Sequence, residues 1–255
     1  MQIVVSAGDA ITARLVEEAG FGGIWVSGFE ASARLGLPDN GSITMSEMLD
    51  VARPIVRAVK IPVWVDCDTG YGNLKRTAKE FAYIGVEGIC VEDNLCDKQN
   101  SLWGGKCELM RAEVFADRLS TITDKIKVIA RTESLIRGYG MNEAIRRANL
   151  YMTTNPAYVL VHSRDTTGKE AMEIPKYWNE WEIPLAIVPT KFPHITTAQL
   201  ESVGYEMIIF ANQTERIKIK SIREALKILK KGRMLPIEKT LSATLDDMRN
   251  LTPCE

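Results

Sequence analysis

The chain alternates short apolar runs with longer segments whose apolar residues recur at helical spacing. The short runs are rich in β-branched residues and end in Gly, Asp, Ser or Asn, which is typical of strands in a parallel sheet. Eight strands are predicted in this way, at residues 3–6, 23–28, 63–68, 88–93, 127–133, 158–163, 185–190 and 207–212. Eight helices are predicted to follow them, at 11–19, 46–59, 74–84, 111–123, 142–152, 169–180, 197–203 and 215–230.

Eight strand–helix pairs in sequence predict one (β/α)8 TIM barrel of the α/β class. The length of 255 residues agrees with this prediction, since such barrels usually contain about 250 residues. We expect the catalytic barrel to occupy residues 1–232. The amphipathic tail, residues 233–255, is left over after the barrel closes, and we expect it to pack on the barrel or on a neighbouring subunit.

The composition argues against several classes of partner, location and metal site. Hydrophobic residues make up 45% and charged residues 25%, and the formal net charge is −1, so we expect no nucleic-acid and no membrane partner. No apolar run approaches the ~20 residues of a membrane span, and no basic-then-apolar leader opens the chain, so a cytoplasmic protein is expected. Five cysteines without a C-x-x-C pair indicate reduced thiols, and only two histidines argue against a histidine-rich zinc site.

The predicted strands end in polar residues. In a (β/α)8 barrel the carboxyl ends of the strands converge on one mouth, where catalytic groups gather. Capping of loops or pairing among themselves explains any one of these residues but explains the whole set poorly. In strand order they are Trp25 and Ser27, Asp66 and Asp68, Glu92 and Asp93, Arg131 and Glu133, His162 and Ser163, Thr190 and Lys191, and Asn212.

Two carboxylates at one strand end indicate a metal site. Strand periodicity places Asp66 and Asp68 on one face and directs Cys67 the other way, into the helix layer. With Glu92 on the next strand, three carboxylates meet, and they repel one another unless a cation or a shared proton compensates. Mg²⁺ suits one or two direct carboxylates with retained waters. The alternative is plain turn chemistry, because Asp-x-Asp also occurs beside glycines.

A long segment without helical periodicity follows the fourth strand and predicts a lid over the mouth, at about residues 94–107. It exceeds the usual ~2 to 6 residues of such a connection, and its alternative is a surface loop. Lys98, Asn100 and Ser101 supply a cation and polar donors suited to an anionic substrate. Arg131 suits a carboxylate or phosphoryl group as well as a structural ion pair. His162 is either a satisfied core histidine or a donor to substrate, and its position favours the donor.

Together these residues resemble the phosphoenolpyruvate mutase and isocitrate lyase superfamily, from about residue 11 to residue 230. The segments that carry the resemblance are 17–28 (EEAGFGGIWVSG), 35–39 (LGLPD), 66–73 (DCDTGYGN), 92–93 (ED), 129–131 (IAR), 162–163 (HS) and 188–191 (VPTK). The lid differs between branches of the superfamily. Isocitrate and methylisocitrate lyases carry a catalytic cysteine where this chain has Asn100, and phosphonopyruvate hydrolases typically carry threonine there.

The Lys-x-Asn-Ser form of the lid is similar to that of the mutase branch, although Asn94 stands where the mutase pattern has lysine. Gly8 and Asp9 replace a usual His-Asn, and Trp103 replaces a usual histidine. The resemblance implies interconversion of phosphoenolpyruvate and phosphonopyruvate. A phosphonopyruvate hydrolase, or a carbon–carbon lyase acting through a metal-held enolate, is the alternative within the superfamily. A non-catalytic metabolite-binding protein is the alternative outside it.

The resemblance also implies a role for each matched residue. It implies that Asp66 binds Mg²⁺ directly, that Asp68 and Glu92 act through water, and that Ser27 and the amide of Gly28 bind the substrate carboxylate. The implied contacts to the phosphoryl group come from Asn100, Arg131 and His162.

Four further features are implied by the resemblance. Trp25 walls the pyruvyl unit, Ser101 contacts substrate, and Lys98 and Asp39 close the site and balance its charge. The superfamily tends to exchange its last barrel helix between subunits, so a homo-oligomer, a dimer or tetramer, with swapped C-terminal helices is expected.

Overall fold

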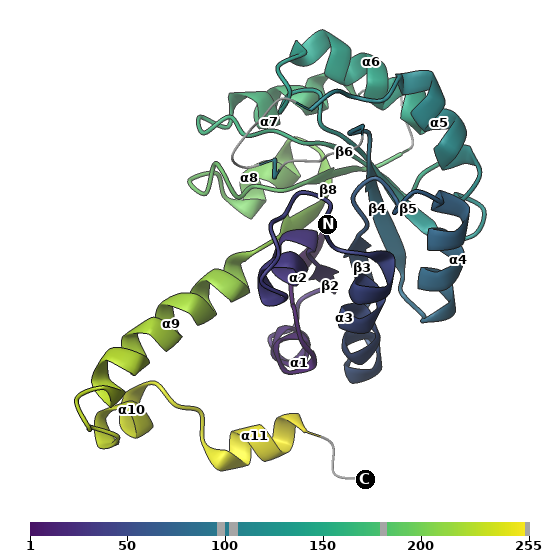
Figure 1. Cartoon of the computed structure of the whole chain (residues 1–255). Helices are drawn as coiled ribbons and strands as arrows, with labels where there is room; N and C mark the ends of the chain where they lie inside the picture. Colours follow the sequence, from purple (N-terminus) through teal and green to yellow (C-terminus); the bar gives the residue numbers. More distant parts are fainter. Residues whose placement is uncertain (96–99, 102–106, 179–182, 253–255) are drawn as a thin grey trace.

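The computed structural model describes residues 1–95, 100–101, 107–178 and 183–252. Within these ranges eight parallel strands form a closed barrel in sequence order (Figure 1), and the predicted (β/α)8 barrel is confirmed. The strands are β1 (Gln2–Ser6), β2 (Gly23–Val26), β3 (Val63–Asp66), β4 (Gly88–Glu92), β5 (Lys127–Thr132), β6 (Tyr158–Val161), β7 (Leu185–Ile187) and β8 (Tyr205–Phe210).

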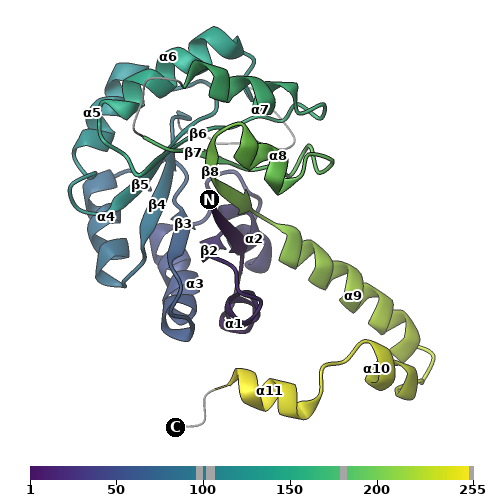
Figure 2. The ribbon, with the colours of Figure 1, turned by 180° about the vertical axis from the view of Figure 1, so that it is seen from behind.

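Helices follow the strands and cover the outside of the barrel over most of its circumference (Figures 1 and 2). No described helix is both long and apolar enough to cross a bilayer. The helices are α1 (Ala10–Glu18), α2 (Gly28–Arg34), α3 (Met45–Ala58), α4 (Leu74–Tyr83), α5 (Ala112–Ser120), α6 (Gly140–Met152), α7 (Lys169–Glu173) with a 3-10 turn (Ile174–Tyr177), α8 (Thr197–Ser202), α9 (Gln213–Leu229), α10 (Leu235–Thr240) and α11 (Leu245–Leu251).

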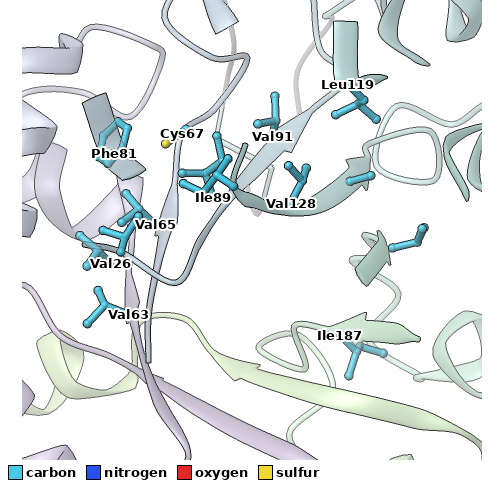
Figure 3. Close-up of a cluster of buried hydrophobic side chains, with 14 of the residues drawn as sticks. Val26, Val63, Val65, Cys67, Phe81, Ile89, Val91, Leu119, Val128 and Ile187 are labelled. Atoms are coloured by element: carbon cyan, nitrogen blue, oxygen red, sulfur yellow. The ribbon is translucent and has the colours of Figure 1, made fainter. Parts of the chain in front are cut away.

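Two layers of buried side chains hold the barrel together. One fills the barrel interior and includes Trp25, Trp64, Ile129 and Met207. The other lies between the strands and the helices, where residues such as Val65 and Phe81 pack together (Figure 3). Alternate residues of each strand point to opposite layers. Cys67 belongs to the outer layer and is fully buried, as predicted.

Every strand except β1 ends earlier than its apolar pattern predicts. β3 ends at Asp66, and Asp68 has a φ of +48°, in the left-handed region. Asp68 is therefore part of a turn, and its side-chain direction comes from this turn and not from strand periodicity as predicted. The predicted helix 169–180 is shorter because a 3-10 turn containing Pro175 replaces its second half, and residues 179–180 lie outside the described ranges.

Helix α2 was not predicted: Gly28 was assigned to the end of a strand, and residues 29–34 were assigned to no element. It begins at Gly28, directly after β2, and the Ser27 hydroxyl caps it by accepting a hydrogen bond from the Glu30 backbone N–H. Position Gly28 suits only a small residue, because an added Cβ would lie 3.3 Å from Asp68 Oδ1 and 3.6 Å from Asp66 Oδ2. The helix thus brings its first turn against the two carboxylates.

Helix α9 leads away from the barrel (Figures 1 and 2). None of its residues is buried, although its sequence is amphipathic, and Ile222 and Leu226 are 57% and 58% exposed. A groove of about 760 Å³ lies beside its start, and apolar side chains of α1, α8 and β8 line it. The tail returns to α1, where Arg14 Nη1 donates to the Leu251 carbonyl at 2.7 Å. Large apolar side chains of α9 are thus left exposed within the described chain.

Candidate active site

A small cavity lies at the carboxyl ends of the strands, the end predicted to carry the chemistry. Its volume is about 50 Å³, so it admits only a small ligand unless the segments around it move. The residues that line it are Trp25, Ser27, Phe29, Asp39, Asp66, Asn100, Ser101, Arg131, His162, Val188, Thr190, Ala211 and Asn212. Most of the predicted site residues therefore meet in one place.

Arg131 is an ion-pair partner of three carboxylates of this mouth. Its guanidinium lies 2.7 Å from Glu133, 3.3 Å from Glu92 and 3.7 Å from Asp66. Burial alone would raise the pKa of Glu133, but Arg131 and His162 together lower it well below its usual range. The same three carboxylates raise the pKa of Arg131 against the effect of its burial. The arginine is thus permanently charged and held by neighbours from β3, β4 and the end of β5.

His162 is a neutral side chain whose outer nitrogen faces the cavity. Burial and the nearby Arg131 lower the pKa of His162. Its Nδ1 lies 2.9 Å from Arg131 Nη2 and 2.7 Å from Glu133 Oε1. When Nδ1 accepts from the arginine, Nε2 carries the proton and can donate. Among the described residues Nε2 has no hydrogen-bond partner, and the same is true of Thr190 Oγ1 and Asn212 Oδ1 in the same cavity.

Two residues of the lid segment reach the mouth. Asn100 Nδ2 donates to Asp39 Oδ2 at 2.5 Å. Ser101 Oγ donates to Glu133 Oε2 at 2.5 Å and accepts from Arg131 Nη2 at 3.0 Å. The segment is therefore linked to both sides of the cavity. Residues 96–99 and 102–106, which include the predicted Lys98, lie outside the described residues.

The stems of the lid segment pair with each other at its base. The Leu95 N–H donates to the Glu108 carbonyl, and the Met110 N–H donates to the Asp93 carbonyl, both at 2.8 Å. Asp93 itself points away from the mouth and accepts from Tyr151 and Arg147, at 2.7 and 3.1 Å. The two adjacent carboxylates at the end of β4 therefore have different places. Glu92 lies at the mouth beside Arg131, and Asp93 binds side chains of α6.

The oxygen donors of the mouth fit a hard divalent cation. Asp66 and Asp68 approach the same point at Gly28, and Glu92 lies across Arg131 from Asp66. Among the described residues no group of three or more His, Cys, Asp or Glu side chains is arranged to hold a metal ion by itself. Mg²⁺ does not need such a group, because it binds one or two carboxylates and keeps several waters.

Some residues of the site were not predicted as functional. Glu133 is fully buried and joins Arg131, His162 and Ser101. The spacing from Arg131 was the available signal, since residues two apart at a strand end face the same way. Thr190 and Asn212 also follow strands, but nothing in their local sequence separates them from capping residues.

An eight-stranded parallel barrel with acidic, basic and histidine side chains at its carboxyl-end mouth has the architecture of an enzyme. The chain belongs to the phosphoenolpyruvate phosphomutase family, since the model of that family matches residues 1–230. The resemblance read from the sequence is thereby confirmed.

Relatives with several different activities, which include a hydrolase, phosphomutases and 2-methylisocitrate lyases, are similar to the chain. The phosphonopyruvate hydrolase of Variovorax sp. (strain Pal2) is 36% identical over 230 residues, which cover 86% of this chain and 79% of the relative. The crystal structure of phosphoenolpyruvate phosphomutase from Streptomyces platensis subsp. rosaceus matches with a TM-score of 0.94 and 35% identity, covering 98% and 90% of the two chains. A phosphonopyruvate hydrolase complex with oxalate and Mg²⁺ matches with a TM-score of 0.89 and 32% identity, covering 98% and 89%. These similarities define the family and leave the specific reaction open.

Proposed function

We propose that the protein is a phosphoenolpyruvate mutase, an isomerase that interconverts phosphoenolpyruvate and phosphonopyruvate. The observation that carries the proposal is Asn100, which enters the mouth from the lid segment and is hydrogen-bonded to Asp39. A carboxamide neither attacks a phosphoryl group nor removes a proton from water. It suits a reaction in which a phosphoryl group must be held and water kept away.

Mg²⁺ is proposed as the cofactor, held directly by Asp66 and through waters by Asp68 and Glu92. The oxygen donors at the mouth support this proposal, and a related hydrolase was crystallised with oxalate and Mg²⁺. When bound, the ion supplies positive charge to the carboxylate and enolate oxygens of the pyruvyl unit. Ser27 and the Gly28 amide are proposed to orient that carboxylate.

The side chains proposed to hold the phosphoryl group are Asn100, Arg131 and His162, with Ser101 beside them. Phosphoryl transfer passes through a loose transition state, so positioned donors matter more than a nucleophile. Arg131 supplies a fixed positive charge, and His162 is proposed to donate from Nε2, in the tautomer whose Nδ1 accepts from Arg131. Trp25, which belongs to the apolar cluster inside the barrel, forms an apolar surface of the cavity.

Exclusion of water completes the proposed mechanism. A metaphosphate-like group that meets water becomes phosphate, and the reaction then is hydrolysis. The links from Asn100 to Asp39 and from Ser101 to Glu133 hold the lid segment against both walls of the cavity. Lys98, in the same segment, is proposed to add a positive charge on closure.

A homo-oligomer with exchanged C-terminal helices is also proposed. The apolar groove of about 760 Å³ beside α1 and α8 lies where a closed barrel carries its last helix. Helix α9, which would fill that position, leads away with its apolar residues exposed. The α9 of a second copy of the chain has the matching character, so reciprocal exchange would cover both surfaces.

Phosphorus NMR after incubation of the protein with phosphonopyruvate and Mg²⁺ tests the proposed reaction. Appearance of phosphoenolpyruvate supports the mutase. Release of inorganic phosphate with pyruvate identifies the hydrolase, the activity of the Variovorax relative. An unchanged spectrum, with phosphoenolpyruvate also unchanged in the reverse direction, contradicts both and directs attention to carbon–carbon cleavage of 2-hydroxy or 2-oxo dicarboxylates.

A further inference from the structure

Asn94, the first residue of the lid segment, is fully buried between a carboxylate of the mouth and an arginine outside it. Its Nδ2 donates to Glu92 Oε1 at 2.6 Å. Arg137 Nε donates to Asn94 Oδ1 at 3.0 Å. Arg137 lies in the loop after β5 and does not line the mouth cavity. Three side chains thus form a chain of hydrogen bonds that runs from the barrel wall to the mouth.

Arg137 and Glu92 together determine which way the carboxamide of Asn94 points. A guanidinium only donates hydrogen bonds, so the oxygen of Asn94 must face Arg137. The amide nitrogen then necessarily faces Glu92 and can donate to it. Without Arg137, Glu92 would still favour this orientation, but Asn94 Oδ1 would lose its arginine donor and the side chain would be held more loosely.

This arrangement also sets the direction of Glu92. With Oε1 accepting from Asn94, the other oxygen, Oε2, is the one turned to the mouth, 3.3 Å from Arg131 Nη2. A carboxylate that serves a cation through water must present one oxygen in a fixed direction, and hydrogen bonds to its other oxygen provide that constraint.

We propose that Arg137 is a positioning residue that acts through Asn94 to aim the carboxylate of Glu92 at the metal site. The proposal rests on the metal role assigned to Glu92 under the proposed function. Asn94 stands where the resembling mutases carry a lysine. In this chain the nearby positive charge belongs to Arg137, which is linked to Glu92 by hydrogen bonds through the neutral amide of Asn94. Because Asn94 begins the lid segment, the same bonds tie the base of the lid to the metal site.

Binding of Mn²⁺ in the absence of substrate, followed by the electron paramagnetic resonance signal of the free ion, tests the proposal without relying on turnover. Arg137→Ala and Asn94→Ala should each weaken binding by about tenfold to a hundredfold, as loss of supporting hydrogen bonds around metal ligands does. The double variant should bind about as weakly as Asn94→Ala, because the proposed effect of Arg137 on Glu92 passes through that residue. Arg137→Lys, which keeps a donor, should recover part of the loss.

The matched control is Arg146→Ala, which removes an arginine that pairs with Glu143 and Glu113 on the outer surface of α6. It should bind Mn²⁺ as the unaltered protein does. Thermal melting checks that each variant is folded, and Arg137→Lys carries the test if Arg137→Ala is not.

Each outcome decides the matter. Unchanged Mn²⁺ affinity in folded Arg137→Ala or Arg137→Lys overturns the proposal, and so do additive losses in the double variant. An unaltered protein that binds no Mn²⁺ overturns it as well. The phosphorus NMR experiment judges the mutase reaction separately, so a protein that releases phosphate but shows the predicted Mn²⁺ losses contradicts the mutase and supports the role of Arg137.

Discussion

Asn100 of the lid segment donates a hydrogen bond to Asp39 of the loop between α2 and α3, with 2.5 Å between Nδ2 and Oδ2. The two residues are 61 positions apart in the chain, and their bond crosses the mouth of the barrel. It gives the carboxamide a fixed place over the cavity that contains Arg131 and His162. A fixed donor at this place is what the proposed transfer of a phosphoryl group requires.

Replacement of Asn100 by alanine should lower kcat about a hundredfold to a thousandfold, the usual effect of losing one donor to a developing negative charge. Binding of Mn²⁺ and the melting temperature should stay close to those of the unaltered protein. Steady-state kinetics with phosphonopyruvate measures the effect. Asn142→Ala, on the exposed side of α6, is the control and should not change kcat. Activity within a few-fold of normal in Asn100→Ala would remove this residue from the mechanism.

Asp66→Asn should abolish Mg²⁺-dependent activity and weaken Mg²⁺ binding more than any other single change at the mouth, because it removes the one proposed direct carboxylate ligand. Calorimetry with Mg²⁺ and oxalate measures the binding. Asp117→Asn, at an exposed position of α5, is the control. A chelator should abolish the activity of the unaltered protein, and added Mg²⁺ should restore that activity. Full affinity in Asp66→Asn would disprove the assignment.

Glu133→Gln should cost stability and activity together. Glu133 is fully buried against Arg131 and His162, and removal of one partner from a buried ion pair typically costs about 3–5 kcal/mol. We expect a loss at the low end, because Arg131 keeps Asp66 and Glu92 as partners. Chemical denaturation measures the free energy of unfolding. A variant as stable as the unaltered protein would contradict the central place given to this ion pair.

The same variant predicts a change in the titration of His162. The negative charge of Glu133 raises the pKa of His162, against the larger opposing effects of burial and Arg131. In Glu133→Gln the pKa of His162 should therefore fall further below its ordinary value. The chain has only two histidines, so NMR of the imidazole protons follows both, and His194→Gln assigns them. A rise of the pKa would contradict the stabilising effect of the Glu133 charge on the protonated imidazole of His162.

The sequence predicted the barrel and most of the site because both depend on short-range patterns. Each strand is an apolar run, and the residues that follow it meet at one mouth as soon as the barrel closes. This is why Asp66, Arg131 and His162 were found without knowledge of distant contacts. The turn at Asp68 was missed because a left-handed backbone at a non-glycine residue leaves no periodic signal.

Other features depend on contacts that local sequence does not contain. In the sequence, Glu133 is indistinguishable from the other polar residues at strand ends. Its importance comes from its bonds to Arg131 and Ser101, which only the structure shows. From the sequence, Asn94 is only a difference from the lysine of the mutase pattern. The structure shows that Arg137 donates a hydrogen bond to it. The course of α9 away from the barrel is likewise not visible in its own sequence pattern, which is that of an ordinary barrel helix.

Charged substitutions on the apolar face of α9 should separate the subunits. Ile222→Glu with Leu226→Glu places two carboxylates on the surface proposed to enter the groove of a second copy. Light scattering after size-exclusion chromatography should show a lower mass than that of the unaltered protein. Glu224→Lys, an exposed residue on the same helix, is the control and should keep the oligomer. An unaltered protein that is already monomeric, or a variant that keeps its mass, would contradict helix exchange.

Because Glu30 is buried, we expect the free energy of unfolding to fall as the pH rises toward neutrality. Burial, with the nearby Glu215, raises the pKa of Glu30 from 4.5 to about 7. Between these values the folded protein holds a proton that the unfolded chain releases, so the free energy of unfolding decreases with pH across this window and levels off above it. A shift of this size corresponds to a contribution of up to about 3 kcal/mol.

Glu30→Gln, which keeps the shape and removes the charge, should therefore be more stable than the unaltered protein at pH 8 and nearly equal to it at pH 5. Denaturation with urea at a series of pH values measures the difference. Glu18→Gln, at an exposed position of α1, should leave the pH profile of the unaltered protein in place. A Glu30→Gln profile parallel to that of the unaltered protein between pH 5 and 8 would mean that Glu30 stays ionised in its buried position and is stabilised there by a positive neighbour such as Lys218.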